Sequence, residues 1–238
     1  MFLFLKLYLA HLIGDFVLQF DELYRLKLKS PWGHFFHALV HAALSLALLF
    51  PYLDAPFIWI FVFVTADIHL FQDALKYKLI QNRKYHFPIF TLDQILHLLF
   101  LATIALFPAS RQSVPLPADG FLSSLYLDNR WTYVLIAWIS ATMAGSYTLH
   151  AFSVSYLGDH RKDRFISRLE LIHGFFERTV VGALFFLASN PLVWLAAPAA
   201  GGVRLLSAKL RNRRDFLVSL IYAACVGILF RLLPLAVQ

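Results

Sequence analysis

The chain has 238 residues, of which 60% are hydrophobic and 15% are charged. Soluble domains carry roughly 25% charged and about 45–50% apolar residues, and a water-soluble fold of this length exposes too much surface to hide such a composition. The single cysteine, Cys225, excludes a disulfide framework and a cysteine-based zinc site. In a soluble protein the formal net charge of +7 would point to nucleic acid, but here the basic residues lie in short loops between apolar runs, as in membrane proteins. We therefore expect an integral membrane protein that contacts lipid and binds no nucleic acid.

A transmembrane helix needs about 20 mostly apolar residues, and eight segments of the sequence meet this requirement. In chain order they are roughly 2–20, 33–50, 56–77, 88–107, 131–157, 168–189, 191–208 and 215–235. The first lacks the charged start and cleavage site of a signal peptide, so we expect it to be a mature span. The seventh contains Pro198 and Gly201, and a re-entrant or interfacial segment is the alternative there. The predicted fold is an all-α, polytopic bundle of about eight transmembrane helices.

The segment 108–130 is the one long connection between these predicted spans. It is rich in proline and contains a glycine, which predicts an irregular extracytoplasmic loop. This loop divides the chain into a four-span N-terminal half, 1–107, and a C-terminal membrane half, 131–238.

Positive charges set the expected orientation of the spans. Sixteen of the 21 lysine and arginine residues fall in the first, third, fifth and seventh loops. Because cytoplasmic loops of membrane proteins are enriched in lysine and arginine, these loops are predicted to be cytoplasmic. Both termini are then extracytoplasmic.

Polar residues line one face of each of the first four spans. Their spacing of three or four residues brings side chains to the same side of a helix. The four stripes are His11, Asp15 and Gln19; His34, His37 and His41; His69, Asp73 and Lys76; and Asp93, Gln94 and His97. In the predicted topology all four lie near the cytoplasmic boundary, so we expect them to meet at one depth in the bundle.

The stripes predict a metal site. Ionisable side chains at mid-bilayer cost roughly 2.5–3.5 kcal/mol each on insertion scales, so they usually face the bundle interior and pair. Imidazole nitrogens and carboxylate oxygens are donors that divalent transition metals prefer. We predict one or two divalent ions, with zinc as the expected metal; a proton or ion pathway and a purely structural network are the alternatives. The predicted ligands are His11, Asp15, His37, His41, His69, Asp73 and His97.

A short repeat agrees with a shared site. The pair His11 and Asp15 is repeated 58 residues later, with the same spacing, as His69 and Asp73. Two helical hairpins of the same orientation would place these residues around one axis.

The same residues resemble the bacterial membrane proteins grouped as the domain-of-unknown-function 3307 family. The matching stretches are HLIGDFVLQ at 11–19, the His-rich start of the second span, HLFQDALK at 69–76 and DQILH at 93–97, with looser matches at 177–181 and 208–216. The resemblance implies a helical architecture in the bacterial inner membrane, and it implies no activity.

The His-x3-Asp pattern beside clustered histidines is also similar to the inner-membrane metal-dependent hydrolases, although the spacing of the second span departs from that group's pattern. This resemblance implies metal-assisted hydrolysis of a phosphoester in a lipid. It carries ligand roles to His11, Asp15, His37, His69, Asp73 and His97. For such a reaction, Asp93 is expected to orient a ligand imidazole or to act as a general base. Gln19 and Lys76 are expected to hold an anionic headgroup.

Two other functions use the same stripes. A metal or proton transporter needs polar groups through the whole bilayer, but the extracytoplasmic halves of the first four spans hold little besides Thr65 and Thr103. A non-catalytic membrane scaffold needs no metal.

A second polar group lies in the C-terminal half. Glu170, His173 and Glu177 share one face of the sixth span. A local pair between a glutamate and a basic residue is one interpretation, and an anion-binding extension of the site is the other.

Overall fold

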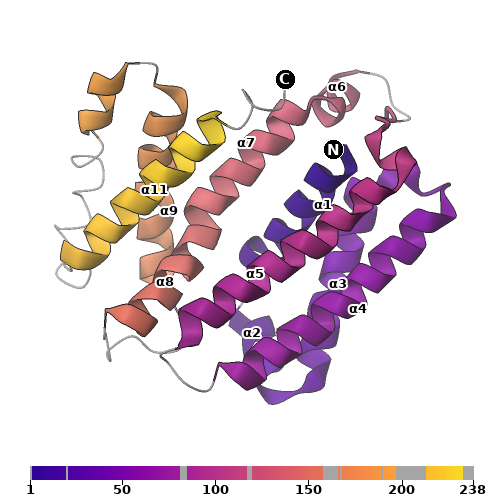
Figure 1. Ribbon diagram of the computed structural model, residues 1–238, viewed down its shortest axis with the longest axis horizontal. Helices are drawn as coiled ribbons and strands as arrows, with labels where there is room; N and C mark the ends of the chain where they lie inside the picture. Colours follow the sequence, from indigo (N-terminus) through magenta and orange to yellow (C-terminus); the bar gives the residue numbers. More distant parts are fainter. Residues whose placement is uncertain are drawn as a thin grey trace. The chain divides into compact units, whose positions relative to one another are not determined.

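The computed structural model describes residues 2–19, 21–80, 85–116, 120–157, 166, 168–188, 190–196 and 213–232. Every regular element within these residues is a helix, which confirms the all-α prediction (Figure 1). The chain divides into two units, Met1–Ile136 and Ala137–Gln238, and each is described by itself.

The first unit contains the elements that carry the four predicted polar stripes. In chain order they are α1 (Phe2–Leu12), the π-helical turn η1 (Ile13–Val17), α2 (Asp21–Lys29), α3 (Pro31–Leu48), η2 (Phe50–Tyr52), α4 (Pro56–Leu79), α5 (His86–Ala102), η4 (Thr103–Leu106), η5 (Pro108–Arg111) and α6 (Phe121–Leu127). The helices α3, α4 and η5 begin at a proline, where a missing N–H costs least. The Ser30 hydroxyl caps α3 by accepting a hydrogen bond of 3.3 Å from the backbone nitrogen of Trp32.

Helix α1 is the buried centre of this unit. All of its residues except Phe4 and Tyr8 are buried. It packs against α3 and α5, and α4 packs against the same two helices (Figure 1). Their shared core includes Leu3, Leu7 and Val62. The burial explains why α1 has almost no amphipathic pattern in the sequence: it is apolar all round except at buried Lys6 and at His11, where the polar stripe begins.

Helix α2 turns sharply away from α1. The axes of Phe2–Val17 and Glu22–Lys29 differ by 86°. Helix α2 lies against the first turn of α3, where a Cβ added at Gly33 would be 2.3 Å from the backbone nitrogen of Lys27. The close approach of two backbones therefore requires glycine at this position.

The structure supports fewer membrane spans than the eight predicted from the sequence. Within the described residues, Pro56–Leu79 and His86–Leu106 are long and apolar enough to cross a membrane, and the bent pair formed by α1–η1 and α2 would make a third. These agree with the predicted spans 56–77, 88–107 and 2–20. The count of about eight is therefore corrected to two, or three with the bent pair.

Two of the five other predicted spans, 33–50 and 215–235, fall short for identifiable reasons. Helix α3 corresponds to the predicted span 33–50, but its 18 residues include three histidines, which lower its mean hydropathy. The last apolar helix covers only Phe216–Leu232. Most of the predicted span 191–208 lies outside the described residues.

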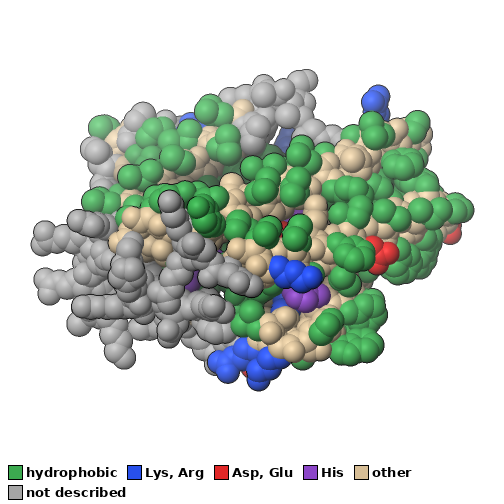
Figure 2. Space-filling view, turned by 60° about the horizontal axis from the view of Figure 1, so that its bottom comes forward, with side chains coloured by type: hydrophobic (Ala, Val, Ile, Leu, Met, Phe, Trp, Pro, Cys, Tyr) green, Lys and Arg blue, Asp and Glu red, His purple; other side chains and the backbone are tan. Residues whose placement is uncertain are grey.

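The outer surfaces of the long helices are strongly apolar. Hydrophobic side chains cover much of the described surface seen in Figure 2. On α4, Ile60 and Phe71 are 66% and 70% exposed, and on α5, Leu99 is 60% exposed. Exposed apolar area on this scale is typical of a surface that contacts a membrane or another protein.

The predicted irregular loop 108–130 contains helical segments. It contains η5 and α6, and tyrosine hydroxyls fix it to neighbouring elements. Tyr52 donates to the Gln112 carbonyl at 2.7 Å and accepts from the Val114 nitrogen at 2.9 Å, while Tyr126 donates to the Leu48 carbonyl at 2.8 Å. Burial raises the pKa of both tyrosine hydroxyls, which keeps them protonated for donation.

The second unit is also helical. The chain enters it through α7 (Asn129–Ile139) and continues as the π-helical turn η6 (Ser140–Ala144), α8 (Gly145–Tyr156), α9 (Arg168–Leu187), η7 (Pro191–Ala196) and α11 (Arg213–Leu232). Helix α9 packs against η6, α8 and α11. A Cβ added at Gly227 would lie 2.8 Å from the Gly182 carbonyl, so α9 and α11 approach closely at these glycines.

Buried Arg178 joins α9 to three other elements of the second unit, η6, α8 and α11. Its guanidinium donates to the Thr142 carbonyl at 3.0 Å, to the Ser219 hydroxyl at 3.2 Å and to the Ser146 hydroxyl. The π-helical turn η6 contains Thr142, and such turns leave carbonyls available to side chains. Glu177, beside Arg178, is buried as well.

Candidate metal centre

Five histidines and one aspartate gather inside the first unit, and we call this group the imidazole layer. Its members come from four segments that are distant in sequence: α1 with η1, α3, α4 and α5. They are His11, Asp15, His37, His41, His69 and His97, and each is at most 6% exposed. The predicted clustering of histidines and aspartate is therefore confirmed.

Local backbone features bring Asp15 and His41 together. Asp15 lies in the π-helical turn η1, and π-turns inside helices change the direction in which side chains point and occur often at functional sites. A Cβ added at the neighbouring Gly14 would lie 2.6 Å from the Cε1 and Nε2 atoms of His41. The missing side chain of Gly14 therefore makes room for the imidazole.

Asp15 is the centre of the layer. Its Oδ1 atom lies 3.0 Å from His37 Nε2, 3.1 Å from His41 Nε2 and 3.5 Å from His69 Nε2. Its Oδ2 atom lies 3.6 Å from His11 Nε2. One carboxylate thus faces four imidazoles.

One ligand atom each from His11, Asp15, His41 and His69 can be chosen so that all four lie within 4.8 Å of one another. The imidazole rings also contact each other: the centroids of His41 and His69 are 4.0 Å apart, and those of His69 and His97 are 4.3 Å apart. Three imidazoles and a carboxylate match the ligand types of protein zinc sites.

Several nitrogens of the layer lack hydrogen-bond partners among the described residues. They are His11 Nε2, His37 Nδ1 and both ring nitrogens of His69 and His97. A buried polar atom without a partner costs about 1–3 kcal/mol, and native proteins rarely tolerate a cluster of them without a ligand. The donor set therefore fits a bound cation.

A second polar group, which we call the ion-pair layer, lies about one helical turn from the imidazole layer, toward the C-terminal end of α4 and the N-terminal end of α5. It consists of Lys27, Asp73, Lys76 and Asp93. Asp73 receives Lys27 Nζ at 2.8 Å on Oδ2 and Lys76 Nζ at 2.7 Å on Oδ1. Lys76 Nζ also lies 2.9 Å from Asp93 Oδ2.

This second layer changes the expected roles of three residues. Asp73, a predicted metal ligand, has both oxygens paired with ammonium groups, because Lys27 and Lys76 both reach it. Lys76 was expected to hold an anionic headgroup, but its charge is matched by Asp73 and Asp93. The Gln19 side-chain carbonyl, which was given the same role, accepts from Lys27 at 2.8 Å.

Asp93 keeps a place beside the histidines. Its Oδ1 atom lies 3.7 Å from His97 Nδ1, so it faces the imidazole that it was expected to orient. Gln94 joins the layers, because its amide nitrogen lies 3.1 Å from Asp15 Oδ2 and 3.2 Å from Asp93 Oδ2.

Two residues of the site were not among the predicted site residues: Lys27 and His34. Lys27 belongs to the first predicted loop, whose positive charges indicated only the orientation of the spans, but its side chain is fully buried. His34 Nδ1 lies 3.2 Å from Asp73 Oδ2. The spacing of His34, His37 and His41 was a usable signal for His34, whereas nothing in the basic stretch around Lys27 distinguishes it from its neighbours.

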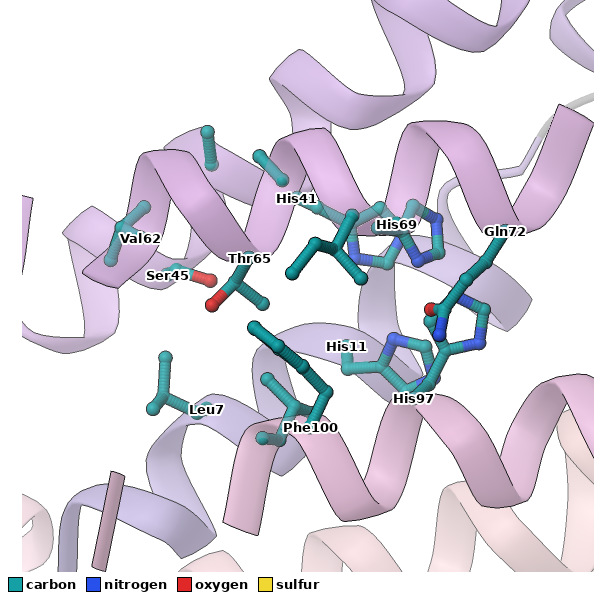
Figure 3. Close-up of a pocket in the computed structure, with 14 residues that line it drawn as sticks. Leu7, His11, His41, Ser45, Val62, Thr65, His69, Gln72, His97 and Phe100 are labelled. Atoms are coloured by element: carbon teal, nitrogen blue, oxygen red, sulfur yellow. The ribbon is translucent and has the colours of Figure 1, made fainter. Parts of the chain in front are cut away.

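A small cavity adjoins the imidazole layer on the side opposite the ion-pair layer. Figure 3 shows the rings of His11, His41, His69 and His97 toward one end of it and Leu7, Ser45 and Val62 toward the other. These last three residues lie one or two turns from the histidines of their helices, in the direction away from the ion-pair layer of Lys27 and Lys76. The cavity therefore has an imidazole wall with the Gln72 amide beside it, and a mostly apolar remainder with two hydroxyls, those of Ser45 and Thr65.

Comparison with protein families identifies the segment that builds this centre. Residues 3–117 match the family described as protein of unknown function, DUF3307. The resemblance seen in the sequence is thus confirmed over the DUF3307 region, which contains every residue of both layers. No curated protein and no solved structure matches the chain.

Proposed function

We propose that the DUF3307 region is a membrane-embedded metal-binding module, in which His11, Asp15, His41 and His69 hold one divalent ion, with zinc as the expected metal. The observation that carries this proposal is the convergence of these four buried donors within 4.8 Å. His37 and His97 pack directly against them and complete the surroundings of the ion.

The charge balance of the two layers supports a bound cation. Lys27 and Lys76 are matched by Asp73 and Asp93, which leaves the carboxylate of Asp15 among imidazoles and one amide. A buried carboxylate is costly unless a positive charge compensates it. A divalent ion at Asp15 supplies that charge and also uses the nitrogens that lack hydrogen-bond partners.

We further propose that the module is a hydrolase acting on an ester of a membrane lipid. A divalent ion in such a site acidifies a water and polarises the oxygen of a carbonyl or phosphoryl group. His97 lines the cavity and faces Asp93, so it is placed to take a proton while the carboxylate orients its ring. The apolar surfaces of α4 and α5 favour a substrate drawn from the membrane.

Metal analysis tests the proposal. The purified full-length protein is expected to contain about one equivalent of zinc, and His69→Ala is expected to lose it, because His69 lies at the centre of the ring contacts. His173→Ala, in the second unit, is the matched control and should retain the metal. Equal metal content in all three proteins would contradict the site. Release of fatty acid or phosphate from vesicle lipids by the wild type, but not by His97→Ala, would then support hydrolysis.

A metal or proton transporter is the second candidate. The observation that favours it is the continuous run of polar side chains from Asp15 through Gln94 and Asp93 to Lys76. Beyond the imidazole layer, however, the described lining of the cavity is mostly apolar, so the polar run continues on one side only. Uptake of zinc into sealed vesicles that contain the protein would decide for transport.

A further inference from the structure

Lys27 is an unusual residue for a short surface-type helix. Its side chain is completely buried, while Glu22, Arg25 and Lys29 of the same helix are exposed. A lysine is almost never fully buried unless it is paired. The ammonium of Lys27 is paired with Asp73 at 2.8 Å and with the side-chain carbonyl of Gln19 at 2.8 Å. The burial of this charge therefore depends on the docking of α2 against α3 and α4.

From Lys27 the contacts continue without a break to the proposed metal ligand. Asp73 holds Lys76 at 2.7 Å, and Lys76 holds Asp93 at 2.9 Å. The Gln94 amide then lies within hydrogen-bond distance of Asp93 and of Asp15. The run passes from α2 to α4, to α5 and finally to η1.

The orientation of Gln94 is fixed by its neighbours. Ionised carboxylates only accept hydrogen bonds, so Gln94 must present its NH₂ group, and not its carbonyl, to both Asp93 and Asp15. The amide uses one N–H for each carboxylate. A change in the position of the Asp93 carboxylate therefore moves the Gln94 amide and, through it, the Oδ2 atom of Asp15. The Oδ1 atom of Asp15 remains directed at the histidines.

We infer that Lys27 is a positioning residue for Asp15, so that docking of α2 and binding of the metal are coupled. This inference rests on the proposed metal site and adds a regulatory element to it. Without Lys27, the second oxygen of Asp73 loses its ammonium, and Lys76 is drawn toward Asp73 and away from Asp93. Gln94 then no longer holds Asp15 in place. Coupling is reciprocal, so the metal must stabilise docked α2 to the same extent.

Zinc affinity of the full-length protein, measured by competition with a chromophoric chelator, tests the inference. Lys27→Met is expected to bind zinc roughly 10–100-fold more weakly, which is the range for residues that orient metal ligands without touching the metal. Lys29→Met removes an exposed charge from the same helix and should bind as the wild type does. The double variant Lys27→Met with Asp73→Asn should recover part of the affinity, because it removes both members of the buried pair. The visible spectrum of the Co²⁺-loaded protein should change in Lys27→Met and not in Lys29→Met.

The outcomes separate this inference from the metal site itself. A wild type that binds no zinc overturns the proposed function and the inference together. A wild type that binds zinc, with Lys27→Met equal to Lys29→Met, overturns only the inference. If Lys27→Met does not fold, hydrogen exchange of the α2 amides in the wild type decides: slower exchange on addition of zinc supports the coupling, and unchanged exchange contradicts it.

Discussion

At the scale of single residues, Gly14 is the most direct structural requirement of the site. A methyl group there would overlap the His41 imidazole, at 2.6 Å from two ring atoms, and would push the ring away from Asp15. We predict that Gly14→Ala keeps its helical circular dichroism but binds zinc roughly 10–100-fold more weakly. Gly182→Ala is the control, because its methyl group would sit 3.6 Å from the nearest atom. Wild-type affinity in Gly14→Ala would show that His41 is not a ligand.

The helical faces that carry the histidines of the site can be predicted from the sequence. Spacing of three or four residues identified the helical faces of His11, His37, His69 and His97, because helical periodicity fixes which side chains share a face. It did not separate Asp15 from Asp73, since both follow a histidine by four residues. Asp15 faces four imidazoles, whereas Asp73 faces one imidazole and two ammonium groups. This difference depends on where Lys27 and Lys76 reach, and that is decided by tertiary packing.

At the scale of elements, Arg178 holds the second unit together. Its guanidinium joins α9 to η6 and α8 through Thr142 and Ser146, and to α11 through Ser219. Replacement by methionine would leave these buried acceptors without their donor, at about 1–3 kcal/mol for each group.

We therefore predict that Arg178→Met lowers the free energy of unfolding by about 2–4 kcal/mol and leaves zinc affinity unchanged. Arg130→Met removes an exposed arginine and is expected to lie within about 0.5 kcal/mol of the wild type. Thermal unfolding in detergent, followed by circular dichroism, measures both. Identical midpoints for the two variants would contradict the role given to Arg178.

Helix starts follow from local sequence, whereas breaks and bends within helices do not. Prolines stand at the starts of α3 and α4, because the N-terminal positions of a helix tolerate a missing N–H. The π-helical turns at Asp15 and Thr142 were not predicted, since the regular spacing of polar residues indicates only an α-helix. The 86° turn between α1 and α2 was likewise absent from the sequence interpretation, which continued the first span to residue 20.

At the scale of the whole molecule, the composition correctly indicated an all-helical chain with apolar segments of membrane-spanning length. The count of eight spans was too high, because apolar composition alone does not decide whether a segment forms one long helix. Helix α3 shows the reason: the histidines that build the imidazole layer also reduce its hydropathy. A buried polar site and an apolar outer surface thus compete for positions on the same helix.

In the function proposed above, the imidazole layer holds a divalent metal ion through three histidines and one carboxylate. X-ray absorption spectroscopy at the zinc edge of the purified wild-type protein tests it most directly. We predict a shell of nitrogen and oxygen atoms at about 2.0–2.1 Å with no sulfur, together with the outer-shell scattering typical of several imidazoles. Stoichiometric zinc with few or no imidazole ligands, or a protein that purifies without metal and takes up none, would contradict the account.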